Sequence, residues 1–444
     1  MLNISKENQF FHINYIYMLP LICLAMMFTR EARATPRMSL SAGTPCSGCH
    51  YSNNGGGGRT DLGWSSMSRA GALTYDQIGL KALHDQHSSV IADMVTVGAD
   101  VRLQVGRFGV PYLDEASGEV KYPDISSIPM QFQPYLALTP VEGLIVYGSI
   151  LPGPGAMEGD LNEQGFPGMS PYEYWASYSF SPSLPTIRIG KFQPTFGIRH
   201  DDHTILQRGD ALTTRVPVIP PNFTEMGAEI SYRPLRFLQA DLGGFRTVQL
   251  QEVFDKRVNE ELELAPFAIA SRVTVYPHIT LGEKEEDDDD DDNDNDDDDD
   301  FGEDEEEATP VNLNGWFGLS SYWSKEFHLL NGFIGIGTSF GLSGVAEVAF
   351  RDNPNSSQKI FQQLNALFGL NYAFKNWLVF NARVERGQTQ RLTTALDEVA
   401  VTWQYVAGLE FFPIPYVEIR PEYRLVDTYD YRFGQAMVQV HLFY

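Results

Sequence analysis

The feature of this sequence that most constrains its fold is a two-residue alternation of apolar and polar side chains, which begins after Ala92 and recurs up to the C-terminus. Val101, Leu103 and Val105 alternate with polar or small residues, and the stretch 417–425 repeats the pattern with charged residues in the polar positions. Successive side chains of a β-strand point to opposite faces, so this period predicts strands with one apolar face. That face is the core in a water-soluble sheet and the lipid-facing surface in a membrane barrel.

The number and length of these segments favour the membrane barrel. We predict about 16 strands, most of them close to the roughly 9–11 residues that a tilted membrane strand needs. Composition agrees, because 12% of the residues are aromatic and 39 are glycine, which suits strands with aromatic girdles. The predicted strands lie near residues 92–108, 128–139, 143–151, 171–180, 186–193, 223–233, 236–247, 264–276, 312–324, 328–340, 343–351, 361–374, 377–387, 399–412, 415–427 and 431–444.

The connections between these strands alternate between short and long, as in outer-membrane barrels. Tight turns are expected at 140–142, 233–235, 375–377 and 413–415, and long loops at 109–127, 152–170, 194–222 and 388–398. The last predicted strand ends in the aromatic Tyr444, which resembles the C-terminal signature of outer-membrane proteins. The sequence therefore predicts a mainly β fold, an outer-membrane antiparallel β-barrel over residues 92–444, surrounded by lipid and with both termini on the periplasmic side.

The first residues predict export. Lys6 precedes an apolar run from Tyr15 to Phe28, and Ala32-Arg33-Ala34 follows it, the order of a secretory signal peptide with cleavage after Ala34. The run is interrupted by Pro20 and is shorter than the roughly 20 apolar residues of a membrane-spanning helix. We therefore assign residues 1–34 to a signal peptide of a cell with an outer membrane.

The net charge of −26 is concentrated in one segment. Residues 283–307 hold 20 of the 58 acidic residues and one lysine, which leaves 38 acidic against 31 basic residues elsewhere, a balance of −7. We predict a solvated, disordered insert in a periplasmic connection. A weak Ca²⁺ site or a docking segment for a basic periplasmic cytochrome are two sharper interpretations. We expect no nucleic-acid partner.

Residues Cys46-Ser47-Gly48-Cys49-His50 form a CxxCH pattern. Two thiols at this spacing attach one porphyrin through thioethers, and the adjacent imidazole becomes an axial ligand of the iron. The alternatives are a chance CxxC beside a histidine and half of a zinc site. The only other cysteine, Cys23, lies in the predicted signal peptide, so a zinc site would need histidines as its remaining ligands. We predict one covalent haem c, bound by Cys46, Cys49 and His50, in a small segment over residues 35–91 that is short for an independent core.

A second axial ligand would let the iron pass electrons without binding small molecules. The candidates near the motif are Met38, Met67, His84 and His87, of which Met67 is our working assignment. Residues 199–203, Arg-His-Asp-Asp-His, follow the strand near 186–193 and could bind a transition metal on the outer face. An ordinary polar surface loop explains them better. No hydrolytic motif stands out.

Together, a signal peptide, one CxxCH near the mature N-terminus and a C-terminal barrel of about 16 strands resemble the fused monohaem cytochrome c–porin family of outer-membrane iron oxidases. The segments 36–43 before the motif, 62–71 behind it and 190–197 at the end of the predicted fifth strand share this likeness. The segment 190–197 also resembles phosphate-selective porins that carry no haem, and the acidic insert is not expected in the family.

The resemblance implies an electron conduit. Extracellular Fe(II) would give an electron to the haem, which would pass it to a periplasmic c-type cytochrome, and residues 35–91 would fold into the barrel as a plug held by inward charges such as Arg383, Glu385, Arg420 and Glu422. Two alternatives stay open: the same conduit run outward, to metal oxides, and a diffusion porin with a structural or sensory haem segment. An Fe(II)-oxidising activity follows only from the first.

Overall fold

The chain is described by a computed structural model over residues 36–443, except residues 69, 80–89, 92–93, 108–110, 115, 152–169, 182, 201–204, 207–222, 252–263, 283–310, 326, 354–358, 394–396 and 429–431. The predicted signal peptide, the acidic insert and the ligand candidates His84 and His87 lie outside the described residues. No helix in the described ranges is long and apolar enough to cross a membrane.

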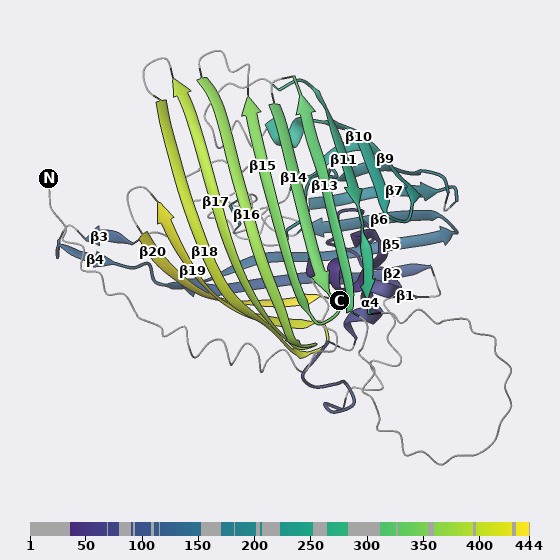
Figure 1. Ribbon diagram of the computed structural model, residues 1–444, viewed down its shortest axis with the longest axis horizontal. Coiled ribbons are helices and arrows are strands. Elements are labelled where there is room, and N and C mark those ends of the chain that lie inside the picture. Colours follow the sequence, from purple (N-terminus) through teal and green to yellow (C-terminus); the bar gives the residue numbers. More distant parts are fainter. Residues whose placement is uncertain are drawn as a thin grey trace.

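Three short helices form the N-terminal part: α2 (Pro36–Ala42), α3 (Cys46–Cys49) and α4 (Asp61–Met67). The hydroxyl of Thr60 accepts a hydrogen bond from the Gly63 amide and caps α4. Such short helices are not stable alone, because most helical stability comes from tertiary packing. They lie at the end of the barrel where the C-terminus is found (Figure 1).

The rest of the described chain is β-structure. The strands are β1 (Val90–Ile91), β2 (Val95–Arg107), β3 (Tyr112–Asp114), β4 (Glu119–Lys121), β5 (Ile125–Val141), β6 (Leu144–Leu151), β7 (Ser170–Ser179), β8 (Thr186–Phe192), β9 (Glu225–Leu235), β10 (Leu238–Arg246), β11 (Phe267–Val275), β12 (His278–Leu281), β13 (Val311–Ser324), β14 (Phe327–Thr338), β15 (Leu342–Asn353), β16 (Lys359–Lys375), β17 (Leu378–Thr393), β18 (Asp397–Ile414), β19 (Val417–Thr428) and β20 (Arg432–Phe443).

Sixteen of these strands form one closed antiparallel barrel. Each pairs with its neighbours in chain order, and β2 closes the barrel by pairing with β20 on one side and β5 on the other. The short β1 pairs with the start of β2, β12 continues β11 along β13, and β3 and β4 form a separate hairpin. The prediction of about 16 antiparallel strands is confirmed, and each predicted range overlaps one barrel strand.

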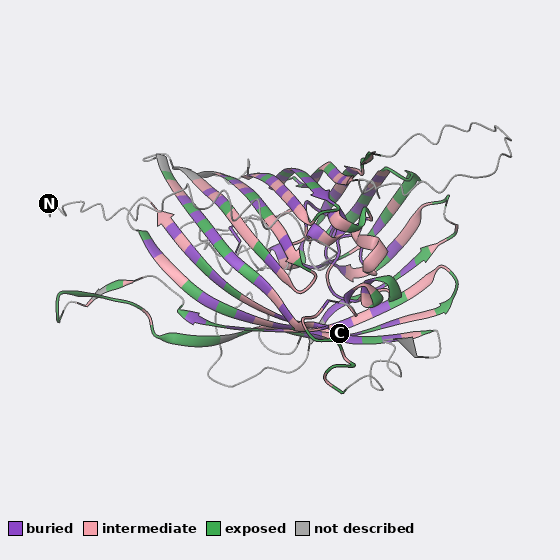
Figure 2. Ribbon diagram, turned by 60° about the horizontal axis from the view of Figure 1, so that its bottom comes forward, coloured by how far each residue is buried: buried purple, intermediate pink, exposed green. Residues whose placement is uncertain are grey.

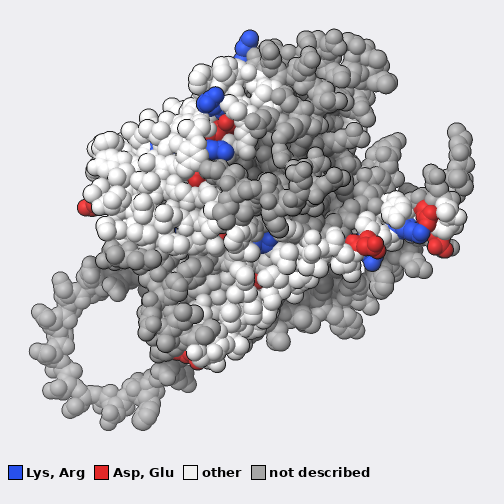
Figure 3. Space-filling model, turned by 180° about the vertical axis from the view of Figure 1, so that it is seen from behind, with Lys and Arg blue, Asp and Glu red and all other residues white. Residues whose placement is uncertain are grey.

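Burial along the strands is inverted relative to a water-soluble protein. On β2 the apolar Val97, Leu103 and Val105 are 39–44% exposed, whereas the polar Asp100 and Gln104 are at most 2% exposed. The same alternation runs along most strands (Figure 2). Over the barrel surface visible in Figure 3 charged side chains are sparse, and they gather instead on the arm that carries β3 and β4.

This apolar outer face and the closed hydrogen-bond ladder are what a bilayer demands, because lipid offers no partner for backbone polar groups. The protein is therefore an outer-membrane β-barrel, as the alternation predicts. The tight turns lie within about two residues of the predicted positions, between β5 and β6, β9 and β10, β16 and β17, and β18 and β19. The acidic insert falls between the eighth and ninth barrel strands, after β12 and before β13.

One expectation about the loops is wrong. Residues 109–127 were expected to be a loop, but they contain the β3–β4 hairpin and the start of β5. Each hairpin strand is only three residues long, and all three residues of β4 are exposed. Such a strand has no apolar face, so it leaves no alternation in the sequence.

Candidate functional site

The CxxCH residues form one tight turn. Gly48 donates its amide to the Pro45 carbonyl at 2.9 Å, and His50 donates its amide to the Cys46 carbonyl at 3.0 Å. The chain then leaves the helix in extended conformation at His50, which forms an isolated β-bridge with Arg59. The local sequence thus brings two half-buried thiols and one imidazole within five residues of each other.

The glycine-rich stretch 53–58 folds back over this turn. Tyr51 donates its amide to the Gly58 carbonyl at 3.1 Å, and Thr60 donates its amide to the Cys49 carbonyl at 3.1 Å. Gly55 has a left-handed φ of +78°, and a Cβ added to it would lie 3.4 Å from the Cys46 Cβ. Only a residue without a side chain fits this conformation easily. The sequence alone showed a glycine-rich stretch without apolar periodicity, whereas the structure shows a loop packed on the motif.

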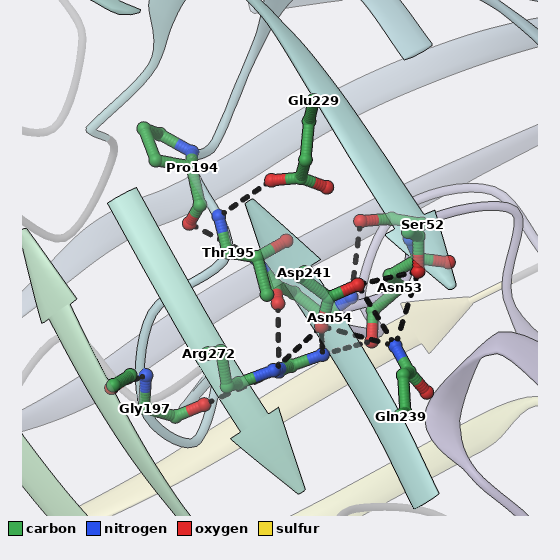
Figure 4. A network of polar contacts seen from close by, with 12 residues as sticks. Ser52, Asn53, Asn54, Pro194, Thr195, Gly197, Glu229, Gln239, Asp241 and Arg272 are labelled. Atoms are coloured by element: carbon green, nitrogen blue, oxygen red, sulfur yellow. Dashed lines mark hydrogen bonds and ion pairs between the residues drawn. The ribbon is translucent and has the colours of Figure 1, made fainter. Parts of the chain in front are cut away.

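Arg272 on β11 connects this loop to the barrel wall (Figure 4). Its guanidinium donates to the Asn54 Oδ1 at 2.9 Å, to the Asn53 carbonyl at 3.3 Å and to Asp241 on β10 at 3.2 Å. Asn54 also donates its amide side chain to the Pro194 carbonyl at 3.0 Å. These bonds join the motif loop to two strands and to the segment after β8.

Further contacts hold the same loop from other strands. Arg188 on β8 donates to the Ser52 hydroxyl at 3.3 Å and pairs with Glu229 at 2.7 Å. Arg199 donates to the Gly55 carbonyl at 3.0 Å, and the Gly58 amide donates to the Tyr147 hydroxyl at 3.2 Å. None of these residues except Arg199 was singled out from the sequence, because their role depends on lumenal position rather than on a local motif.

Apolar contacts dock the helices on either side of the motif. Leu40 of α2 is fully buried against Ile198, Ile205, Trp316 and Phe333. Met67 of α4 is 1% exposed in a cluster with Ala70, Phe412, Tyr416 and Phe443. Two backbone bonds extend this second contact, from the Ala72 amide to the Phe412 carbonyl at 2.8 Å and from the Leu73 amide to the Pro413 carbonyl at 3.0 Å.

The motif opens into a cavity shared by the N-terminal part and the barrel. The cavity has a volume of about 220 Å³ and is partly open to solvent. Cys46, Cys49 and His50 all line it, so the structure brings the three predicted attachment residues together on one cavity wall. Burial raises the pKa of the Cys46 thiol, and the nearby Arg272 cation acts in the opposite direction.

Two of the four candidates for a second axial ligand, Met38 and Met67, line the same cavity. His200 and His441 also line it, and neither was predicted as a ligand. His200 lies 2.7 Å from Glu347 through its Nε2, and His441 contacts a carboxylate with each ring nitrogen. His441, with both ring nitrogens held by carboxylates, is poorly placed to ligate iron. A carboxylate on one ring nitrogen, as in His200, does not prevent the other from binding a metal, so His200 joins the two methionines as a candidate.

The sequence segment 199–203 does not show a metal site in its described part. Arg199 and His200 lie in the lumen, where they contact Gly55 and Glu347, rather than on an outer surface. Asp201, Asp202 and His203 lie outside the described residues. No group of three or more histidine, cysteine or acidic side chains suited to a metal ion is found among the residues that the structure describes.

The inward charges named from the sequence pair with one another in the lumen. Arg383 bonds Glu385 and lies 3.7 Å from Glu422, and Arg420 lies 3.6 Å from Glu422. Arg424 completes the group at 2.7 Å from Glu422. The predicted inward orientation of these side chains is confirmed, and Arg383 and Arg420 also line the cavity.

No family model and no curated protein matches this chain. Among solved structures it is similar to the outer-membrane channel DcaP of Acinetobacter baumannii, with 11% identity, a TM-score of 0.48 and coverage of 79% of this chain and 97% of that one. It is also similar to Pseudomonas putida OprB, with 10% identity, a TM-score of 0.45 and coverage of 84% and 98%. An anion-selective porin from Comamonas acidovorans has 11% identity, a TM-score of 0.42 and coverage of 79% and 98%. Likeness at this level does not bear on what this chain binds or passes.

Proposed function

We propose that this protein is an outer-membrane electron conduit in which one covalent haem c is held inside the barrel by the N-terminal segment. The observation that carries the proposal is the position of Cys46, Cys49 and His50, which share one lumenal cavity with side chains of the barrel wall. In a barrel of about 16 strands the lumen is wide enough to admit such a segment. The fused cytochrome c–porin resemblance, with residues 35–91 as a plug, is part of this proposal.

The residues around the cavity suit a haem. Cys46 and Cys49 would carry the thioether bonds, His50 would be one axial ligand, and Met67, Met38 or His200 would be the other. Met67, Trp316 and Phe333 offer apolar surface for the macrocycle, and arginines supply positive charge for its carboxylates. A bound haem supplies one-electron chemistry, with a potential set by its ligands and surroundings.

The chain's own residues restrict what else crosses the lumen. The Arg272 network and the buried contacts of Leu40 and Met67 pack the segment against different strands of the wall. Ions and water would therefore meet a filled passage in this part of the barrel. An electron would need only a haem within a short distance of its donor and its acceptor. We take extracellular Fe(II) as the donor and a periplasmic c-type cytochrome as the acceptor, with the acidic insert as a docking segment for a basic cytochrome.

Anaerobic addition of Fe(II) to the purified, full-length protein tests the proposal. We expect a reduced c-type spectrum in the wild type and in Ser47→Ala, which keeps both cysteines, and no such spectrum in Cys46→Ala. Failure of Fe(II) to reduce an attached haem at any pH between 3 and 8 would remove iron as the donor. The outward conduit predicts instead that a reduced periplasmic cytochrome reduces the haem and that a metal oxide then oxidises it.

The diffusion porin with a sensory or structural haem segment is distinguished by conductance. A filled lumen predicts small, rare openings of the haem-loaded protein in planar bilayers. A large, steady pore would argue against the plug, as would removal of residues 35–91 from intact barrels by a protease added to the periplasmic side.

A further inference from the structure

One part of the cavity is lined by charged side chains from the first and the last strands of the barrel. Glu418 on β19 and Arg102 on β2 both stand opposite His441 on β20 in the strand register. Glu410 on β18 interacts electrostatically with Glu418 and with Arg37 of α2. This charged wall lies in the same cavity as Cys46, Cys49 and His50.

Arg37 is buried but only partly satisfied. Its side chain is 3% exposed, and its Nη2 donates to the Glu410 Oε2 at 2.5 Å. Its Nε and Nη1 are also buried, and neither has a hydrogen-bond acceptor among the described residues. A guanidinium offers five N–H donors in a planar fork that matches a carboxylate. Arg37 therefore keeps donors available for an acceptor in the cavity.

Arg59 lies on the other side of the motif. Its backbone is bridged to His50, and its Cζ lies 4.6 Å from the centre of the Phe443 ring. Its Nη1 is 3.8 Å from the Asp100 Oδ1, too long for a hydrogen bond, and finds no other acceptor in the described part of the chain. A second cation with unused donors thus lies directly beside the predicted axial histidine.

His441 links two carboxylates of this wall. Its Nε2 lies 3.0 Å from Asp100 and its Nδ1 lies 3.1 Å from Glu418. The two carboxylates are therefore engaged by His441 as well as by the neighbouring arginines.

The charges of this wall do not balance among the described residues. Four arginines face three carboxylates, which leaves an excess of one arginine. The adjoining pairs of Arg383 and Arg424 with Glu385 and Glu422 are balanced and do not change this excess. The arginines are Arg37, Arg59, Arg102 and Arg420, and the carboxylates are Asp100, Glu410 and Glu418.

We propose that this wall is a dicarboxylate site, in which Arg37 and Arg59 bind the two propionates of the haem and so fix its orientation. The proposal rests on the proposed function and names the residues that hold the group at its polar edge. Two propionates carry negative charge, which the excess of arginines in this wall attracts. Unused guanidinium donors in the same cavity as the attachment residues supply the geometry, and both arginines are positioning residues rather than redox centres.

The test uses potentiometric titration of the full-length, haem-loaded protein in detergent micelles between pH 5 and 9. Arg37→Gln removes a cation near the iron, and this loss of positive charge favours the ferric state. We therefore expect the equilibrium constant for reduction of the haem to fall at least tenfold, which lowers the midpoint potential by about 59 mV for a one-electron couple. Arg37→Lys keeps the charge and should recover most of this loss. Arg386→Gln is the matched control, because Arg386 is bonded to Gln388 and does not line the cavity.

The pH at which the potential begins to fall is the second readout. A cation beside a propionate lowers the pKa of that propionate, so Arg37→Gln should move this break to higher pH, which a merely structural arginine would not do. Equal midpoints and breaks in Arg37→Gln and Arg386→Gln would overturn the site. If Arg37→Gln does not assemble, Arg59→Gln is measured in the same way. Absence of covalent haem from the wild type would overturn the proposed function instead.

Discussion

Leu40→Ala tests whether the N-terminal segment is docked on the barrel by its own contacts. Leu40 is 0% exposed and packs on Ile198, Ile205, Trp316 and Phe333, so truncation removes a fully buried side chain and leaves a cavity. Such changes cost about 2–5 kcal/mol. The hydrogen-bonded ladder of the barrel does not pass through Leu40, so we expect the loss to fall on docking of the segment rather than on unfolding of the strands.

At about 1.4 kcal/mol for each factor of ten, this loss raises the population of the undocked segment roughly thirtyfold to several thousandfold. Amide hydrogen exchange followed by mass spectrometry measures it, since exchange reports local opening. We expect faster exchange in residues 36–67 and unchanged exchange in β14 to β18. Leu62→Ala is the control, because Leu62 is 52% exposed in the same segment and should change stability by less than about 0.5 kcal/mol. Unchanged exchange in residues 36–67, or an equal loss in the strands, would refute the reasoning.

Three further predictions concern the same segment. Gly337→Ala should weaken docking of the segment by about 1–3 kcal/mol, because the added Cβ would lie 2.6 Å from the Leu40 Cβ. Faster proteolysis of residues 36–67, with β14 left intact, would show this loss. Asn54→Ala should lower the free energy of unfolding by about 1–3 kcal/mol, because it leaves Arg272 without one buried acceptor; the thermal loss of the folded band on gels measures it. Asn53→Ala keeps its backbone carbonyl bond to Arg272 and should lower stability less, so equal losses in the two variants would contradict the prediction. In haem-free protein, burial raises the pKa of the Cys46 thiol, so less thiolate is present at pH 8. Alkylation of Cys46 should therefore be slow until urea exposes the thiol, and rapid alkylation in the folded state would contradict this.

The barrel could be predicted in detail because every strand faces two different media. Leu103 and Gln104 on β2 are neighbours in the sequence but are 40% and 1% exposed, and this contrast follows directly from the order of residue types. The hairpin β3–β4 does not separate two media, because all three residues of β4 are exposed, and it left no such contrast. Element boundaries also shifted where strands extend beyond the apolar band, as in β17, which runs to Thr393 rather than 387.

The candidate site was predictable only where it is local in sequence. Cys46, Cys49 and His50 follow one another within five positions, so their chemistry can be recognised without a fold. Arg102 and His441 are separated by most of the chain, and they meet through the register that joins β2 and β20. Gln439 and His441 are the polar members of the alternation on the last strand, so both are expected to face the lumen. This was the one signal in the sequence that could have indicated His441.

The pairing of β2 with β20 sets an order of events during biogenesis. Phe443 and His441 lie near the C-terminus, so the wall around the motif stays open until the final strand has been synthesised and joined to the first. Contacts between such distant residues form late, because the chain must first close a very long loop. Closure of the barrel by β2 and β20 is therefore the step that encloses the segment around Cys46 and Cys49.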